Sequence, residues 1–236
     1  MRHRPPYLAF ASTFYTVTEL RLSCIKLWSS RDFLRLVCAF PSLRALSSFD
    51  VSWDRDEGRT LAEEPFAKAL CLQKIEISDR ENISPYKCLL SAPELLQSIK
   101  YVEFSKGGRS NWSVELTLQE TSPLGETPVC HHPSRKAHAV VRDKYGSRGP
   151  PVEWLRGSFD LLDVFLISPS VSCVDIDVEM KIPDEALLNV LRTDPFPFPA
   201  LRARGVLQVT AFSGLDIKTL EWGCTDIFIR RRQVED

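Results

Sequence analysis

The sequence predicts an α/β solenoid of irregular repeats, with parallel strands on the concave face and helices on the convex face. Segments that alternate apolar and polar residues, as strands do, are separated by segments with helical spacing. Strand-start positions 20, 43, 72 and 99 lie 23 (20 to 43), 29 (43 to 72) and 27 (72 to 99) residues apart. Leucine-rich repeats have periods of about 20–29 residues. In addition, Phe40-Pro-Ser-Leu-Arg44 returns as Phe198-Pro-Ala-Leu-Arg202.

The first predicted unit is a strand followed by a short helix. Leu20 and Leu22 alternate with polar neighbours, which indicates a strand with one buried face over residues 17–27. Ser29 and Ser30 can cap the helix, and Pro41 ends it. Between them, apolar residues at helical spacing predict the face that packs on the core, namely Phe33, Leu36, Val37 and Phe40.

The alternation of strands and helices continues downstream. A hairpin or an irregular unit is expected at 112–118, where the next strand arrives too early for a full repeat. The charged segment 50–59 is expected to be a loop, and Trp28 and Trp53 to be packing residues. Further helices are predicted at 61–70, at 84–98 with a break at Pro93, at 154–166 and at 183–191, and further strands near residues 43, 72, 99, 174, 206 and 225.

Composition predicts one domain over 17–229, with a ragged segment at 1–16 and a charged tail at 230–236. A chain of 236 residues with 44% apolar content can bury a core of ordinary size. Segment 119–151, rich in Pro, Gly, Ser and basic residues, is expected to be a long insertion loop with a short strand at 138–141.

Charge and cysteine content limit the class of protein. The formal net charge of -1 argues against nucleic-acid binding, which usually needs a strong positive field. No apolar run approaches the ~20 residues of a membrane span. The seven cysteines show no CxxC spacing and stand mostly among apolar neighbours, which favours a reducing compartment, the cytoplasm or the nucleus.

Alternate residues of the expected strands form a candidate partner-binding surface on the concave face, since inward and outward side chains alternate along a strand. The outward side chains are mostly acidic, which predicts a protein partner with a basic segment. The alternative interpretation is that they are ordinary solvated strand positions. They are Glu19, Arg21, Glu76, Glu103, Glu115, Asp175, Asp177 and Glu179.

Two clusters support an alternative interpretation as an enzyme. Asp175, Asp177 and Glu179 share a strand face, but steps of ~7 Å are too open for acid–base chemistry. Segment 130–132, Cys-His-His, together with His138 offers metal-ligating residue types without zinc-site spacing. Because no nucleophile, phosphate-binding or HExxH motif occurs either, we expect no enzymatic activity, no metal and no cofactor.

Two segments resemble fungal F-box proteins whose C-terminal part is a divergent leucine-rich-repeat solenoid. They are VTELRLSCIKLWSSRDFLRLVCAFPSLRAL, at 17–46 and followed by Trp53, and VDIDVEMKIPDEALLNVLRTDPFPFPALR, at 174–202. The resemblance implies a substrate receptor, in which the F-box docks a ubiquitin-ligase adaptor and the repeats hold the target. Residues 1–16 lack the Leu-Pro opening of an F-box, so the resemblance covers the target-binding half. It implies an adaptor partner only if an F-box lies upstream; an orphan repeat scaffold is the alternative.

Overall fold

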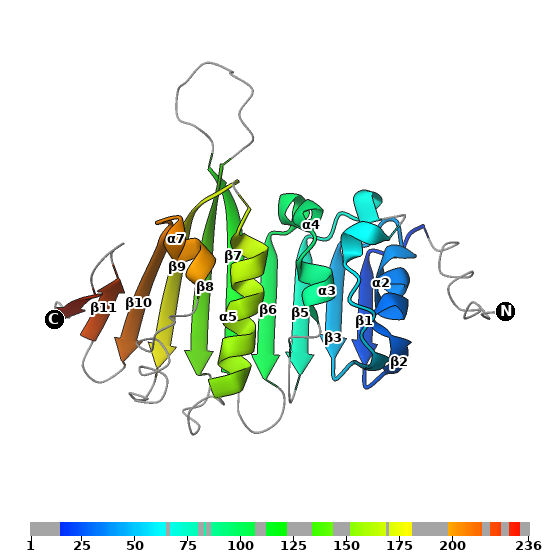
Figure 1. Ribbon diagram of the computed structural model, residues 1–236, viewed down its shortest axis with the longest axis horizontal. Coiled ribbons are helices and arrows are strands. Elements are labelled where there is room, and N and C mark those ends of the chain that lie inside the picture. Colours follow the sequence, from blue (N-terminus) through cyan, green and yellow to red (C-terminus); the bar gives the residue numbers. More distant parts are fainter. Residues whose placement is uncertain are drawn as a thin grey trace, which may run out of the picture.

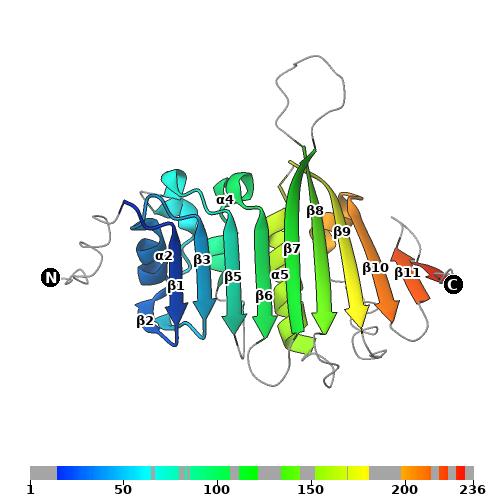
Figure 2. The same cartoon turned by 180° about the vertical axis from the view of Figure 1, so that it is seen from behind.

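The computed structural model describes residues 15–64, 67–79, 83, 86–106, 112–121, 134–143, 152–168, 170–180, 198–213, 218–222 and 227–231. Within these residues, helices pack on one face of a mixed, mostly parallel sheet (Figure 1). The reverse view presents the sheet in front and the helices behind it (Figure 2). The α/β class predicted from the sequence is therefore confirmed.

The described part of the main sheet has ten strands, each hydrogen-bonded to the next across the sheet. In spatial order they are β1 (Glu19–Ser23), β3 (Ala45–Phe49), β5 (Lys74–Asp79), β6 (Tyr101–Lys106), β7 (Trp112–Thr121), β8 (Ser134–Asp143), β9 (Val171–Met180), β10 (Leu207–Ser213), β11 (Lys218–Trp222) and β12 (Ile227–Arg231). β1 to β6 pair in parallel, as do β8, β9 and β10. β7 runs antiparallel to both of its neighbours, and so does β11.

The first four strands repeat at intervals typical of leucine-rich repeats. Glu19 pairs with Ala45, which pairs with Lys74. Lys74 in turn pairs with Tyr101. Equivalent positions are thus 26 (19 to 45), 29 (45 to 74) and 27 (74 to 101) residues apart. The expected first interval of 23 is wrong because β3 begins at Ala45 and not at Leu43.

A second sheet starts where the chain leaves β1 and β3. Cys24 and Asp50, the residues directly after these strands, both have a left-handed backbone with φ of 52°. The chain turns there into β2 (Lys26–Ser29) and β4 (Ser52–Arg55), which pair in parallel. The expectation of one strand over 17–27 is therefore wrong, and the expected loop over 50–59 contains a strand.

Helix α2 (Ser30–Cys38) begins and ends as predicted. The Ser29 hydroxyl accepts a hydrogen bond from the Asp32 N–H at 3.3 Å, and the helix stops before Pro41. Its buried side differs from the expectation, because Leu34 is fully buried while Leu36 is only partly buried. The helix packs against β2, a strand that was not predicted, and against α3 (Lys87–Leu90).

The other helices are short except for α5. They are α3 (Lys87–Leu90), α4 (Pro93–Ser98), α5 (Val152–Leu166) and α7 (Pro199–Ala203). Pro93 lies in the first turn of α4, which confirms the break predicted there. Segment 61–70 holds two 3-10 helices, η1 (Leu61–Glu63) and η2 (Ala67–Ala69), in place of the single helix expected. The helix expected at 183–191 lies outside the described residues.

Membrane-spanning helices are absent from the described residues, in which no helix combines the necessary length and apolar character.

Segment 119–151 is not a single insertion loop. β7 continues to Thr121, and β8 occupies the middle of the sheet between β7 and β9. The short strand expected at 138–141 exists but is longer. Of the two alternatives expected at 112–118, a hairpin or an irregular unit, the structure has the hairpin. The core-facing residues of β8 include Ala137 and Ala139, whose small side chains give a weak hydrophobic signal.

The two Phe-Pro-x-Leu-Arg segments fold differently. Phe40–Arg44 is a turn that leads into β3, whereas Pro199 opens α7 after Phe198, which has a left-handed φ of 73°. Leu43 and Leu201 are both fully buried. The similarity therefore marks equivalent core leucines and not a shared connection from helix to strand.

An aromatic cluster fills the space between α2, β4 and α3. Phe33 stacks on Trp53 with ring centroids 5.3 Å apart, and Tyr86 meets both rings edge-on. The packing role predicted for Trp53 is confirmed. Trp28 differs: it is 60% exposed, and Arg55 lies 4.7 Å over its ring, so the packing role expected of it is wrong.

Candidate binding face

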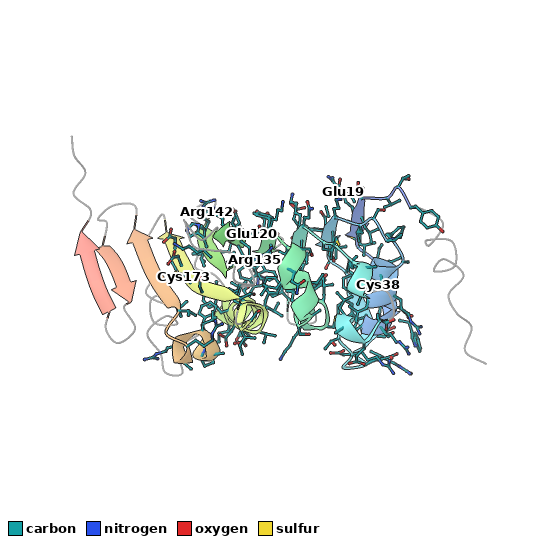
Figure 3. The ribbon with its side chains drawn as sticks, turned by 90° about the horizontal axis from the view of Figure 1, so that it is seen from above. Glu19, Cys38, Glu120, Arg135, Arg142 and Cys173 are labelled. Atoms are coloured by element: carbon teal, nitrogen blue, oxygen red, sulfur yellow. The ribbon has the colours of Figure 1, made fainter. Side chains whose placement is uncertain are left out.

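The strands place alternate residues on opposite sides of the sheet. Leu22, Ile77, Phe104, Val114 and Val178 stand in one row across the strands and are buried under the helices. The alternate residues of β1 and β3 to β9 in the main sheet form the side away from the helices, which we call the polar face. Figure 3 shows Glu19 and Arg142 on this side and Cys38 in the helix layer.

All eight residues predicted for partner binding belong to the polar face by register. One row, read across the strands through Ser47 and Val140, contains Arg21, Glu76, Glu103, Glu115 and Asp177. Glu19 and Asp175 stand in the adjacent row, and Glu179 pairs with Arg142 in the row on the other side. The side chain of Glu179 lies outside the described part of the structure.

Three glutamates stand directly opposite one another on neighbouring strands. Glu76 of β5 pairs with Glu103 of β6, which pairs with Glu115 of β7. We call these residues the glutamate row. Neighbouring strands are ~4.8 Å apart. Like charges in directly opposed positions destabilise a sheet. The fold therefore tolerates a local repulsion here that hydrogen bonds and nearby cations must offset.

The first glutamate of the row is held as a carboxylate. Lys74 Nζ lies 2.6 Å from Glu76 Oε1, and the Ser47 hydroxyl donates a hydrogen bond to Oε2 at 2.6 Å. Partial burial opposes the charged form, but the bonds from Lys74 and Ser47 outweigh it and lower the pKa of Glu76. The same ammonium lies 5.7 Å from the centre of the Tyr101 ring, a cation–π contact.

The other two glutamates accept hydrogen bonds from the same face. The Tyr101 hydroxyl donates to Glu103 at 2.9 Å. Partial burial and this carboxylate raise the pKa of Tyr101, so the hydroxyl remains a donor at neutral pH. Glu115 accepts one bond from Arg142 and one from Ser113, both at 3.2 Å.

β8 supplies basic side chains between the acidic residues of β7 and β9. His138 Nε2 lies 2.9 Å from Asp177 Oδ2, and Arg142 reaches across to Glu115 on the other neighbour. Opposite charges on adjacent strands stabilise the pairing. By register, Arg142 lies between Ser113 of β7 and Glu179 of β9, so the basic residues of β8 offset part of the acidic charge on both neighbouring strands.

The carboxylates of β9 lie beside a thiol that is poorly suited to catalysis. The Cys173 Sγ donates to Asp175 Oδ1 at 3.5 Å. Burial and the nearby Asp175 raise the pKa of Cys173, so the thiol stays protonated at neutral pH. A thiolate is the nucleophilic form. The arrangement offers ion pairs and hydrogen bonds to a partner but no activated nucleophile at Cys173.

No group of three or more His, Cys, Asp or Glu residues is arranged to hold a metal ion among the residues that the structure describes. Segment 130–132 lies outside those residues. His138, which was expected to accompany that segment, is instead a strand residue paired with Asp177.

Sequence reasoning missed the residues that hold the acidic side chains in place. Lys74 and Tyr101 stand two positions before Glu76 and Glu103, hence on the same strand face, and this spacing was the available signal. Arg142 and the pairing of His138 with Asp177 were missed because most of β8 was assigned to an insertion loop.

Comparisons of the chain with protein-family models, with curated proteins and with solved structures find no significant match. The site is therefore interpreted from its own geometry.

Proposed function

We propose that this chain is a non-catalytic protein-recognition module that binds a basic segment of its partner on the polar face. The glutamate row is the observation that carries the proposal. Three carboxylates in directly opposed positions cost stability. A partner that brings cations to these carboxylates relieves their repulsion. The free energy that the repulsion costs the folded chain is then recovered on binding.

The ion pairs of the row resemble the contacts that a basic partner would make. Lys74 pairs with the glutamate at one end of the row and Arg142 with the glutamate at the other, and side-chain exposures of 48% and 41% bring both cations into contact with solvent. Exposed ion pairs of this kind contribute little to stability. Exchange of an internal cation for a partner's arginine therefore costs little, and a planar guanidinium can bind a carboxylate through two hydrogen bonds.

The architecture that we propose for the module is a leucine-rich-repeat-like solenoid. Intervals of 26, 29 and 27 residues between paired strand positions support it. The left-handed residues Cys24 and Asp50, each directly after a strand, are a second repeated feature. In such solenoids the strand face is the usual binding surface.

The resemblance to F-box proteins supports a wider role for this module. We propose that it is similar to the target-binding half of a ubiquitin-ligase receptor. Pull-down of the ligase adaptor by a longer chain carrying an F-box would support that role. Recovery of targets without the adaptor would favour an orphan scaffold.

The test of the binding proposal is direct titration with labelled peptides. An arginine-rich peptide should bind the chain in a fluorescence-anisotropy titration, with affinity that falls as salt is raised. A glutamate-rich peptide of equal length should not bind. Glu76→Gln/Glu103→Gln/Glu115→Gln should weaken arginine-peptide binding by about tenfold or more.

A matched control removes the same charge from elsewhere. Glu57→Gln/Glu153→Gln/Asp160→Asn changes three exposed acidic residues that do not belong to the polar face. This variant should bind like the original chain. Equal weakening by both triple variants would show a non-specific effect of net charge and would overturn the proposal, as would preference for the acidic peptide.

A further inference from the structure

One edge of the main sheet ends in a strand with a single described partner. β1 pairs with β3 and stands first in the strand order. Ala45 N donates to Thr18 O, and Cys24 N donates to Phe49 O, so the even-numbered residues of this segment face β3. By alternation, the N–H and C=O groups of Glu19, Arg21 and Ser23 point to the outer edge. Such an edge is a template for a further strand.

Exposed apolar side chains gather at the same end of the molecule. Among the described residues, the exposed large hydrophobic side chains are Tyr15, Ile25, Trp28, Phe49 and Ile167. The first four precede, follow or neighbour β1. β2, which carries Trp28, pairs only with β4 and is the corresponding edge of the small sheet. Exposed apolar side chains around one edge strand favour an interaction site there.

The charges on β1 are complementary to a second copy of the same strand. Glu19 and Arg21 flank Leu20 on the polar face and form an ion pair at 2.6 Å. In an antiparallel pair centred on Leu20, Glu19 stands opposite the partner's Arg21, and Arg21 opposite the partner's Glu19. Two-fold contacts require this kind of self-complementary pattern.

We propose that β1 is a homodimer interface in which two copies pair these edge strands antiparallel, centred on Leu20. Glu19 and the partner's Arg21 are then a hydrogen-bonded pair, because both present their backbone groups to the outer edge. Leu20 and the partner's Leu20 meet on the helix side. The two ten-stranded sheets become continuous, and both polar faces point the same way.

The pairing also explains a feature of the core. Leu20 is only partly buried in the single chain, although Leu22 beside it on the same strand face is 6% exposed. A second copy covers Leu20 with an identical side chain. The polar face gains the partner's Glu19 and Arg21 at its end, so the proposed binding surface is extended and not blocked.

The first experiment measures the mass of the full chain by sedimentation at several concentrations. The original chain should reach twice its 26.8 kDa. Arg21→Glu and Glu19→Arg each place like charges opposite one another and should weaken association by about tenfold. The double variant Glu19→Arg/Arg21→Glu restores complementarity and should restore the dimer. Circular dichroism should show that all three variants are folded.

A second experiment tests the register. Leu20→Cys in a Cys24→Ser/Cys71→Ser background should form an intermolecular disulfide, because the facing Cα atoms of such a pair are about 4.5 Å apart. Thr18→Cys in the same background faces the partner's Leu22 and should remain unlinked.

Three outcomes would overturn the proposal. They are a monomeric mass at every concentration, a dimer whose association is unchanged by the charge substitutions at Glu19 and Arg21, and equal disulfide formation by the Leu20→Cys and Thr18→Cys variants. A monomer that still binds the arginine-rich peptide would overturn the dimer and leave the proposed recognition function intact.

Discussion

Arg135 is a buried cation that joins β8 to the helix layer. It is 7% exposed and donates to the main-chain carbonyls of Leu96, Gln97 and Ile99 at the end of α4. It also pairs with Glu120 at 3.0 Å. The last carbonyls of a helix have no partner within the helix. The side chain therefore satisfies groups that burial would otherwise leave unpaired.

Arg135→Met should lower the free energy of unfolding by about 3 kcal/mol, because it leaves these carbonyls without their charged donor. Urea denaturation measures the change. Lys136→Met, an exposed neighbour on the polar face, should change stability by less than about 0.5 kcal/mol. Equal losses in both variants would mean that the helix-end contacts of Arg135 contribute nothing.

The core positions of the first unit can be ranked by burial. Leu22→Ala and Leu34→Ala should each cost about 2–4 kcal/mol, because both remove buried methyl groups and leave a cavity. Leu36→Ala should cost about 1 kcal/mol, because its side chain is only partly buried. Chemical denaturation of the three variants tests the order. A larger loss at Leu36 than at Leu34 would contradict the packing described for α2.

Alkaline pH should destabilise the chain through three buried groups. Burial raises the pKa of Tyr86 from 10.0 to about 12, and the pKa values of Cys38 and Cys88 from 9.0 to about 12. The unfolded chain therefore loses these protons at lower pH than the folded chain, so their contribution to stability is present below pH 9 and declines between about pH 9 and 12.

This alkaline dependence is measurable as the free energy of unfolding against pH. Tyr86→Phe should flatten the part of the curve above about pH 10, since the phenol no longer titrates in either state. Tyr15→Phe, at an exposed position, serves as the control. An unchanged slope in Tyr86→Phe would contradict the assignment of that part of the curve to Tyr86.

Helices α5 and α7 are joined by side-chain hydrogen bonds to each other's ends. Asp163 of α5 accepts hydrogen bonds from the N–H groups of Ala200 and Leu201, at 3.2 and 3.1 Å, in the first turn of α7. Arg204, directly after α7, donates to carbonyls at the end of α5, among them Leu166 O and Ile167 O. Asp163 therefore accepts from N–H groups at the start of α7, and Arg204 donates to carbonyl groups at the end of α5.

Asp163→Ala should cost about 1–2 kcal/mol, as the loss of a helix cap does. Asp163→Asn keeps an acceptor oxygen and should cost less. A double-mutant cycle with Arg204→Met should show coupling, because both side chains fix the same pair of helices. Strict additivity in thermal or urea unfolding would mean that the two contacts act independently.

The elements that sequence reasoning found are those with strong periodicity. Their signal comes from individual side chains, namely Leu20 and Leu22 in β1, the serine cap of α2, and the alternating Val174, Ile176 and Val178 in β9. β8 was predicted only as a short strand at 138–141, because alanines face its core. β2 and β4 were missed because their position depends on left-handed turns at Cys24 and Asp50, which are not glycines.

The acidic residues that share the binding face were predictable, but their pairing across neighbouring strands was not. Alternation placed Glu76, Glu103 and Glu115 on one side of the sheet from the sequence alone. Their direct opposition depends on register, and register depends on the loop lengths between strands. Arg142, the cation at one end of the row, lies just beyond the short strand predicted at 138–141.

At the scale of the whole molecule, the proposed dimer predicts a pattern of hydrogen exchange. Amides of β6, β7 and β8 lie between paired neighbours and should exchange slowly at all concentrations. Amides of Glu19 and Arg21 should exchange quickly in dilute solution and slowly at high concentration. Nuclear magnetic resonance or mass spectrometry measures both sets. Concentration-independent exchange at Glu19 and Arg21 would contradict the dimer.

β7 is the single reversed strand between β1 and β10 in the described sheet. The chain reverses once from β6 to β7 and again from β7 to β8, and two reversals restore the original direction. β9 therefore continues with the same polarity as β5 and β6, as if the hairpin had not intervened. The hairpin of β7 and β8 therefore adds two strands to the sheet and leaves β9 and β10 in the orientation of β5 and β6.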